Sequence, residues 1–214
     1  MRGICHVIVG GATAIIADTT LRAVAIACNN SFYNDLNAAL YKPFAAMFPA
    51  SLSQTSVAII IYTIDIILFL VGCLLPDCDS EKSIVGRLVH IPVKHRTWTH
   101  TIWCIIPLTL MGFAVPCFFF LAYGYFLHIL FDSLSKGGIC WFYPISQYKT
   151  WASGAQIKKN HKFYLYRTGK TSEIILLVCV AVAGTIMSMY AVYLSTKHGG
   201  LPFHAEWITD ASRA

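Results

Sequence analysis

The stretch SVAIIIYTIDIILFLVGCLL, residues 56–75, decides the fold class, because it is long and apolar enough to cross a lipid bilayer as a single helix. A helix of about 20 predominantly apolar residues spans the hydrocarbon core of a membrane. Further stretches of this character lie at residues 5–28, 98–115, 117–134 and 173–194. The sequence therefore predicts an all-α fold, a polytopic transmembrane helical bundle with about five spans.

The composition agrees with this class. Of the 214 residues, 57% are hydrophobic and only 12% are charged, whereas a soluble domain carries about 25% charged residues. No linker divides the chain, so we interpret residues 1–214 as a single membrane domain. The eight cysteines form no CxxC pair and lie mostly in apolar stretches, which favours small buried hydrophobic residues over a disulfide framework.

Basic residues are distributed unequally between the two sides of the predicted bundle. On the side of the N-terminus lie 12 of the 16 Lys and Arg residues, at the N-terminus itself, in residues 76–97 and in residues 135–172. Cytoplasmic loops of membrane proteins carry an excess of Lys and Arg. We therefore predict a cytoplasmic N-terminus, a cytoplasmic interfacial segment at 135–172 and a C-terminus outside. The net charge of +6 follows from this pattern, and we expect no nucleic-acid partner.

Single-cysteine labelling tests this orientation. In a Cys-free background, a cysteine in place of Ser212 is expected to react with an impermeant thiol reagent added outside, and one in place of Ser83 is not. The reverse pattern of labelling would overturn the cytoplasmic placement of the N-terminus.

His, Asp and Glu residues, which are side chains of the types that bind metals, gather on the side of the N-terminus at the ends of all five predicted spans. They are His6, Asp77, Asp79, His95, His100, His128, Asp132 and Glu173. Misplacing or omitting any one span would scatter them over both sides. We interpret this convergence as a predicted metal site, and it is the strongest functional signal in the sequence.

The segment LLPDCDSEKS, residues 74–83, ends the second span. Pro76 stops the helix and leaves Asp77 and Asp79 at the interface. Two carboxylates at this spacing can bind one hard cation or reach two different ions. The alternative is a solvated helix end.

The segment HRTWTHT, residues 95–101, opens the third span. His95 and His100 converge if His95 precedes the helix, with Thr97 or Thr99 as the N-cap and His100 in the first turn. Neutral imidazoles suit zinc, iron or manganese. The alternative is an interfacial anchor of basic and aromatic residues.

The segment GYFLHILFDSLSKGG, residues 124–138, ends the fourth span. His128 and Asp132 are four residues apart in an apolar helix, so they share one face. Polar side chains at that depth are costly and need partners. Gly137 and Gly138 would let the backbone turn close beside the site. Two candidate ligands remain, His6 and Glu173. The alternative to metal binding is a structural role for His6 and a capping box for Glu173.

Taken in order, these motifs resemble a known family. They are CHVIVGG at 5–11, LLPDCDSEKS at 74–83 followed by Gly86, HRTWTHT at 95–101, GYFLHILFDSLSKGG at 124–138 followed by WFYP at 141–144, and G-x-x-x-E from Gly169 to Glu173. The set is similar to the YdjM-type proteins, a family of LexA-binding, inner-membrane-associated, metal-dependent hydrolases. The chain departs from that pattern at Cys5, Ser80 and Ser135, none of which is a predicted ligand.

The resemblance implies metal roles for the same eight residues and a place in the bacterial inner membrane. No feature of the chain supports a LexA interaction. Eight ligands exceed one tetrahedral site, so we expect two divalent transition-metal ions, zinc first and manganese or iron next. The expected activity is hydrolysis of a phosphoester or ester, in a membrane lipid or lipid-linked substrate, at the cytoplasmic headgroup level. Asp79 or Glu173 is the expected general base, and Arg96 is expected to hold an anionic substrate group.

Two other classes of function stay open. A transporter of metal or protons would use the polar residues inside the spans, and a non-catalytic envelope-assembly subunit would use a structural metal to clamp helix ends. The polar residues in question are Asp18, Arg22 and Asp65. Asp18 and Asp65 are each 12 residues from a predicted ligand, which places both at about 18 Å depth. We predict that Arg22 pairs with them in a structural ion cluster.

Overall fold

The computed structural model describes residues 3–27, 32–150 and 164–198, and this part of the chain is a bundle of helices without a named strand. The α-helices are α1 (Gly3–Ala27), α2 (Phe32–Ala45), α3 (Gln54–Leu74), α4 (Ile84–Leu88), α5 (Ile102–Ala114), α6 (Cys117–Leu134) and α7 (Thr171–His198). Two 3-10 helices, η1 (Leu75–Asp79) and η2 (Trp98–His100), lie between them. The predicted all-α fold is confirmed.

Apolar segments long enough to cross a membrane occur in α1, in α3 with η1, in α6 and in α7. They are Ile4–Leu21, Ile59–Asp79, Cys117–Leu134 and Thr171–Leu194, and α5 adds a shorter apolar helix. Within each segment the backbone hydrogen bonds are made inside the helix, which is what a lipid environment requires. Four of the five predicted spans therefore coincide with helices of membrane-spanning length, and the fifth, predicted at 98–115, corresponds to the shorter helix α5.

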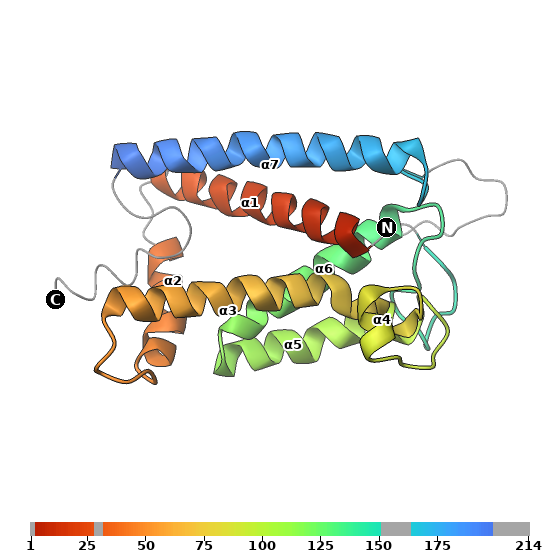
Figure 1. The fold of residues 1–214 in the computed structure, drawn as a ribbon, viewed down its shortest axis with the longest axis horizontal. Helices are drawn as coiled ribbons and strands as arrows, with labels where there is room; N and C mark the ends of the chain where they lie inside the picture. Colours follow the sequence, from red (N-terminus) through yellow and green to blue (C-terminus); the bar gives the residue numbers. More distant parts are fainter. Residues whose placement is uncertain (1–2, 28–31, 151–163, 199–214) are drawn as a thin grey trace.

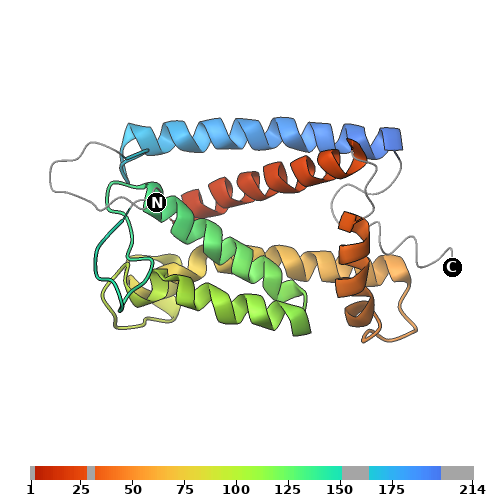
Figure 2. The ribbon, with the colours of Figure 1, turned by 180° about the vertical axis from the view of Figure 1, so that it is seen from behind.

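The long helices form two layers. In Figure 1, α1 and α7 run side by side in one layer, and α3 and α5 lie in the other. Figure 2 shows α6 crossing from one layer to the other. The most extensive packing in the described structure joins α3 to α6, followed by α1 to α7.

Two glycines let α3 and α6 approach each other closely. A Cβ atom on Gly72 would lie 2.3 Å from the carbonyl oxygen of Leu121, and one on Gly124 would lie 2.3 Å from the carbonyl oxygen of Phe69. Small residues at a helix crossing allow backbones to touch, which is how helices associate where lipid removes the hydrophobic driving force. This contact sets the relative position of the two helices that lead to Asp77 and His128.

Some boundaries differ from the prediction. The third span begins at Ile102 rather than Trp98, because Trp98–His100 form a 3-10 turn and Thr101 is extended. His100 therefore lies before the helix, and neither Thr97 nor Thr99 is its N-cap. Helices α2 and α4 were not predicted. Both are short, and segments of this length are helical only when tertiary contacts support them.

Asp65, inside α3, is buried and accepts a hydrogen bond from the Tyr41 hydroxyl of α2 at 3.2 Å. It therefore does not face lipid. The side chain of Arg22 lies outside the described part of the chain, so the predicted ion cluster stays a prediction. The cysteines that the structure describes are all free, and Cys73 and Cys117 are among the buried ones, in agreement with their interpretation as small hydrophobic residues.

Candidate metal centre

The predicted ligands come together at one end of the bundle. Figure 1 shows the start of α1, the end of α3, the end of α6 and the start of α7 at the same end, with η1 and α4 beside them. Six of the predicted residues form three overlapping groups, and within each group one ligand atom per residue lies within 4.8 Å of the others. The groups are His6, Asp77 and His128; Asp77, His95 and His100; and His100, His128 and Asp132.

His128 directs its Nε2 toward Asp77. Its Nδ1 lies 2.6 Å from the carbonyl oxygen of Cys73, which can only accept a hydrogen bond. The proton of a neutral ring is therefore on Nδ1, and Nε2 carries a lone pair. That Nε2 lies 3.6 Å from Asp77 Oδ1 and has no hydrogen-bond partner among the described residues. Two acceptors that face each other across this gap need a cation or a proton between them.

His100 also directs its Nε2 toward carboxylates, and a hydrogen bond with Thr99 fixes which nitrogen of its ring carries the proton. The Thr99 hydroxyl donates its one proton to Asp79 Oδ2 at 2.6 Å, so at 2.9 Å it must accept from His100 Nδ1. His100 Nε2 is left unprotonated, 3.6 Å from Asp132 Oδ2 and 3.9 Å from Asp77 Oδ1. Burial lowers the pKa of His100 below its ordinary value, against the opposite effect of Asp79. The imidazole is therefore neutral, the form that binds metals.

Asp79 stands behind the histidines and orients them. It accepts a hydrogen bond from His95 Nδ1 at 2.7 Å and another from the backbone N–H of Arg96 at 3.1 Å, besides that from Thr99. A carboxylate that accepts from the far nitrogen of a ligating histidine is a common support of metal sites. Asp79 is not a member of the three groups, so the structure places it as a second layer around them.

Asp132 joins α6 to α1 and to the loop before η2. Its Oδ1 lies 3.2 Å from His6 Nε2, and its Oδ2 forms a 2.8 Å ion pair with Arg96 Nη2. The His6 ring stacks on the His128 ring, with centroids 3.7 Å apart. The start of α1 is thereby held against the last turns of α6.

Arg96 is packed into the rim of this cluster. Its Nη1 donates to Ser135 Oγ at 3.1 Å, and a Cβ atom on Gly137 would lie 2.3 Å from the same nitrogen. A side chain at position 137 would therefore require the guanidinium, the end of a flexible side chain, to shift. Arg96 also has φ of 64°, a left-handed conformation that costs a non-glycine residue about 1–3 kcal/mol. The guanidinium contacts Asp132 and Ser135, whereas the sequence predicts that it holds a substrate anion.

Glu173 lies outside the three groups. It is buried in the first turn of α7, and its carboxylate accepts a hydrogen bond from the backbone N–H of Gly169. This contact is close to a capping box, the alternative that the sequence left open.

Sequence reasoning missed three groups that support the site. Thr99 was considered only as an N-cap, although its place between two histidines in HRTWTHT could have suggested a hydroxyl partner for them. The Cys73 carbonyl could not be found, because any backbone carbonyl can accept. Tyr166, fully buried, donates its hydroxyl to the carbonyl oxygen of Phe131, and no local pattern marks it.

The donor set fits a divalent transition metal. Lone pairs of His100 and His128 face the carboxylates of Asp77 and Asp132, and each of these four side chains is buried. Like charges and lone pairs in a buried place are unfavourable unless a cation balances them. His95 is the open member, with 44% of its side chain exposed, so solvent reaches one edge of the cluster.

Membrane-length apolar helices and this buried His and Asp cluster define the chain as an integral membrane protein whose helix ends could hold metal. A family model described as YdjM inner membrane protein matches residues 36–195, a range that contains every candidate ligand except His6. The chain belongs to the YdjM inner membrane protein family. Comparisons with curated proteins and with solved structures found no match.

Proposed function

We propose that this chain is a membrane-bound, metal-dependent hydrolase that cleaves a phosphoester or ester of a membrane lipid at the cytoplasmic headgroup level. The observation that carries the proposal is the set of three overlapping His and Asp groups at one end of a membrane-spanning bundle. A purely structural metal would need no opening, whereas here the His95 edge is exposed. The family membership supports the place of the protein in an inner membrane.

The ligands proposed are His6, Asp77, His95, His100, His128 and Asp132. Mixed imidazole and carboxylate donors suit zinc, manganese or iron. Asp77, His100 and His128 each belong to two groups, which supports two ions that share ligands. Such ions, when bound, supply a water of lowered pKa and polarise the ester oxygen.

The residues outside the ligand set are proposed to orient the ligands, to act as the general base and to hold the substrate. Asp79 keeps His95 directly, and His100 through the Thr99 hydroxyl, in the tautomers that leave Nε2 free for metal. Glu173 is the second candidate for the general base, next to Asp79. Arg96 is proposed to hold an anionic oxygen of the substrate through the exposed part of its guanidinium, since 14% of its side chain is exposed whereas Nε is buried.

Incubation with a total lipid extract tests the activity. The purified full-length protein is incubated with and without a chelator, and products are followed by mass spectrometry. The metal-loaded wild type and the control His90→Ala, which lies outside the groups, are both expected to release a product that the chelator abolishes. Product formation that is unchanged by the chelator would refute a metal-dependent lipid hydrolase. So would the absence of any product with every metal supplied. Metal-dependent flux in proteoliposomes without product would favour the transporter.

A further inference from the structure

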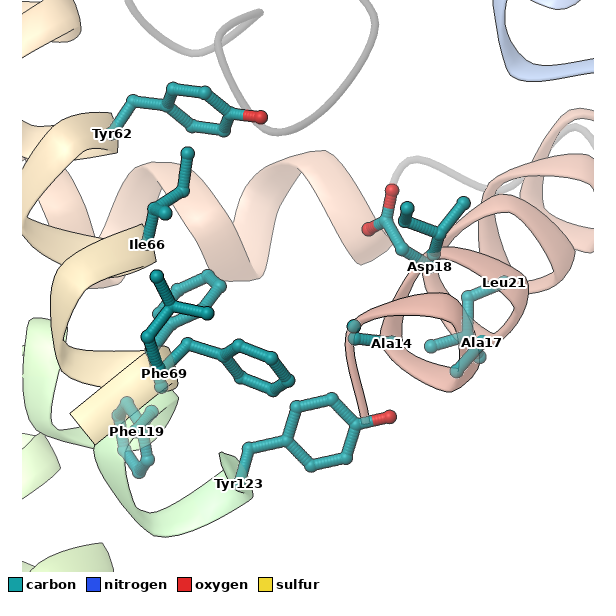
Figure 3. Close-up of a pocket in the computed structure, with 13 residues that line it drawn as sticks. Ala14, Ala17, Asp18, Leu21, Tyr62, Ile66, Phe69, Phe119 and Tyr123 are labelled. Carbon is teal, nitrogen blue, oxygen red and sulfur yellow. The ribbon is translucent and has the colours of Figure 1, made fainter. Parts of the chain in front are cut away.

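A cavity of about 600 Å³ lies between α1, α3 and α6, apart from the candidate metal centre. Figure 3 shows Phe69 and Tyr123 pointing across it toward α1, where Ala14 offers only a short side chain. Its lining is mostly aliphatic and aromatic, with Asp18 among the few polar residues. The cavity has the size of pockets that bind small ligands, about 300–1,000 Å³.

The depth of the cavity is the same on both of its sides. On α1 it runs from Gly11 to Leu21, about 7 to 22 Å along the helix from His6. On α3 it runs from Phe69 and Leu70 back to Tyr62, about 10 to 22 Å from Asp77 by the same rise. Half of a bilayer core is about 15 Å thick. The cavity therefore begins in the leaflet on the side of the candidate metal centre and extends past the middle of the bilayer, along the path of an acyl chain whose headgroup lies at that level.

A second protein helix does not fit this space. An α-helix with its side chains is about 10–12 Å wide, so the volume would hold a cylinder only about 5–8 Å long, roughly one turn. A flexible hydrocarbon chain is narrower and can follow the gap. The lining stretches of α1, α3 and α6 belong to membrane-spanning segments, so lipid chains are the molecules that surround it, and a cavity left empty would forfeit van der Waals contacts.

We propose that this cavity binds one acyl chain of a bilayer lipid, with the headgroup toward the level of the candidate metal centre. Along α1 and α3, the fully buried Val9 and Cys73 stand in sequence between the residues that line the cavity and the candidate ligands His6 and Asp77. That the bound lipid is the substrate rests on the proposed function. Occupation of the cavity by an acyl chain does not depend on the proposed function.

Gly11 offers a way to fill the cavity without disturbing the protein. A Cβ atom there would meet nothing within 4 Å, and a residue other than glycine favours the helix. Gly11→Phe is therefore expected to fold and to occupy the space of the chain. Ile4→Phe is the matched control, since it adds an aromatic ring on the same helix at a position that is 64% exposed and outside the cavity.

The probe is a phospholipid with a diazirine on its acyl chain, in vesicles of phosphatidylethanolamine and phosphatidylglycerol, with chelator present throughout. Photolabelling of the reconstituted wild type and of Ile4→Phe is expected to concentrate on Phe69, Phe119 and Tyr123. In Gly11→Phe most of the labelling at these three residues should be lost, because the added ring fills the cavity. Equal labelling of cavity and outward residues such as Met189, an unchanged pattern in Gly11→Phe, or cross-links between two copies at the cavity would each overturn the inference.

The same proteins separate the two proposals. Cavity labelling in a wild type that hydrolyses no lipid under any metal would keep the chain site and remove the hydrolase. Lipid hydrolysis without concentrated labelling would remove the chain site alone.

Discussion

Asp77→Ala, His128→Ala and Asp132→Ala are each expected to bind divalent metal at least about 10–100-fold more weakly than the wild type and to show no hydrolysis. Loss of residues that only support metal ligands already costs this much, and each of these three side chains belongs to the buried groups themselves. The proteins should still insert in the membrane, because the spans satisfy their backbone hydrogen bonds internally. Elemental analysis after metal supplementation measures the effect.

The three variants differ in what else they disturb. Asp132→Ala leaves the Arg96 guanidinium without its 2.8 Å counterion, and breaking a buried pair costs about 3–5 kcal/mol. His128→Ala breaks no ion pair with a cation, but it removes the ring that stacks on His6 and the donor to the Cys73 carbonyl oxygen. His90→Ala, a histidine outside the groups, should keep the metal content of the wild type. Unchanged metal in all three variants, or a wild type without transition metal, would contradict the metal centre.

Gly124→Ala is expected to destabilise the protein by about 1–3 kcal/mol, the usual cost of overpacking. The added Cβ would lie 2.3 Å from the carbonyl oxygen of Phe69 and 3.0 Å from the backbone nitrogen of Cys73, so α3 and α6 must separate. Asp77 and His128 follow these contacts along the two helices, so metal affinity should fall as well. Unfolding in mixed detergent micelles gives the free energy, and metal titration gives the affinity.

Gly11→Ala makes the matched control, because it is the same substitution in a helix with no atom within 4 Å of the new Cβ. Replacing a helical glycine by alanine gains roughly 0.5–1 kcal/mol when space allows. The two variants should therefore shift stability in opposite directions. A Gly124→Ala protein as stable as Gly11→Ala would show that α3 and α6 are not in backbone contact.

The spans were predictable because a helix that crosses the lipid core needs about 20 consecutive, mainly apolar residues. Residues 117–134 form a helix with the predicted bounds, and 56–75 and 173–194 agree within a few residues. The start of the third span was misplaced at Trp98, where a 3-10 turn stands instead. The prediction counted Trp98 as the start of the apolar stretch, although the rest of the turn, Thr99 and His100, is polar. Helix α2 was missed because its helicity depends on packing, as the contact of Tyr41 with Asp65 illustrates.

For the candidate site, alternation of the spans was sufficient to bring metal-type residues to one end, and six of the predicted ligands meet there in the three groups. What alternation cannot decide is which residues touch within that end. Asp79 lies behind the histidines and Glu173 caps a helix, although sequence spacing treats both like Asp77 and Asp132.

The sequence by itself determined the membrane class, the places of the apolar helices and the end of the bundle that carries the His and Asp residues, because each follows from hydropathy and order along one chain. Only the tertiary structure decided which nitrogen of His100 and His128 is free, how Arg96 is bound and where the cavity lies. These depend on distances between helices. Where α3 crosses α6, Gly72 and Gly124 allow a short distance, because a Cβ atom at either position would lie 2.3 Å from a carbonyl oxygen of the other helix.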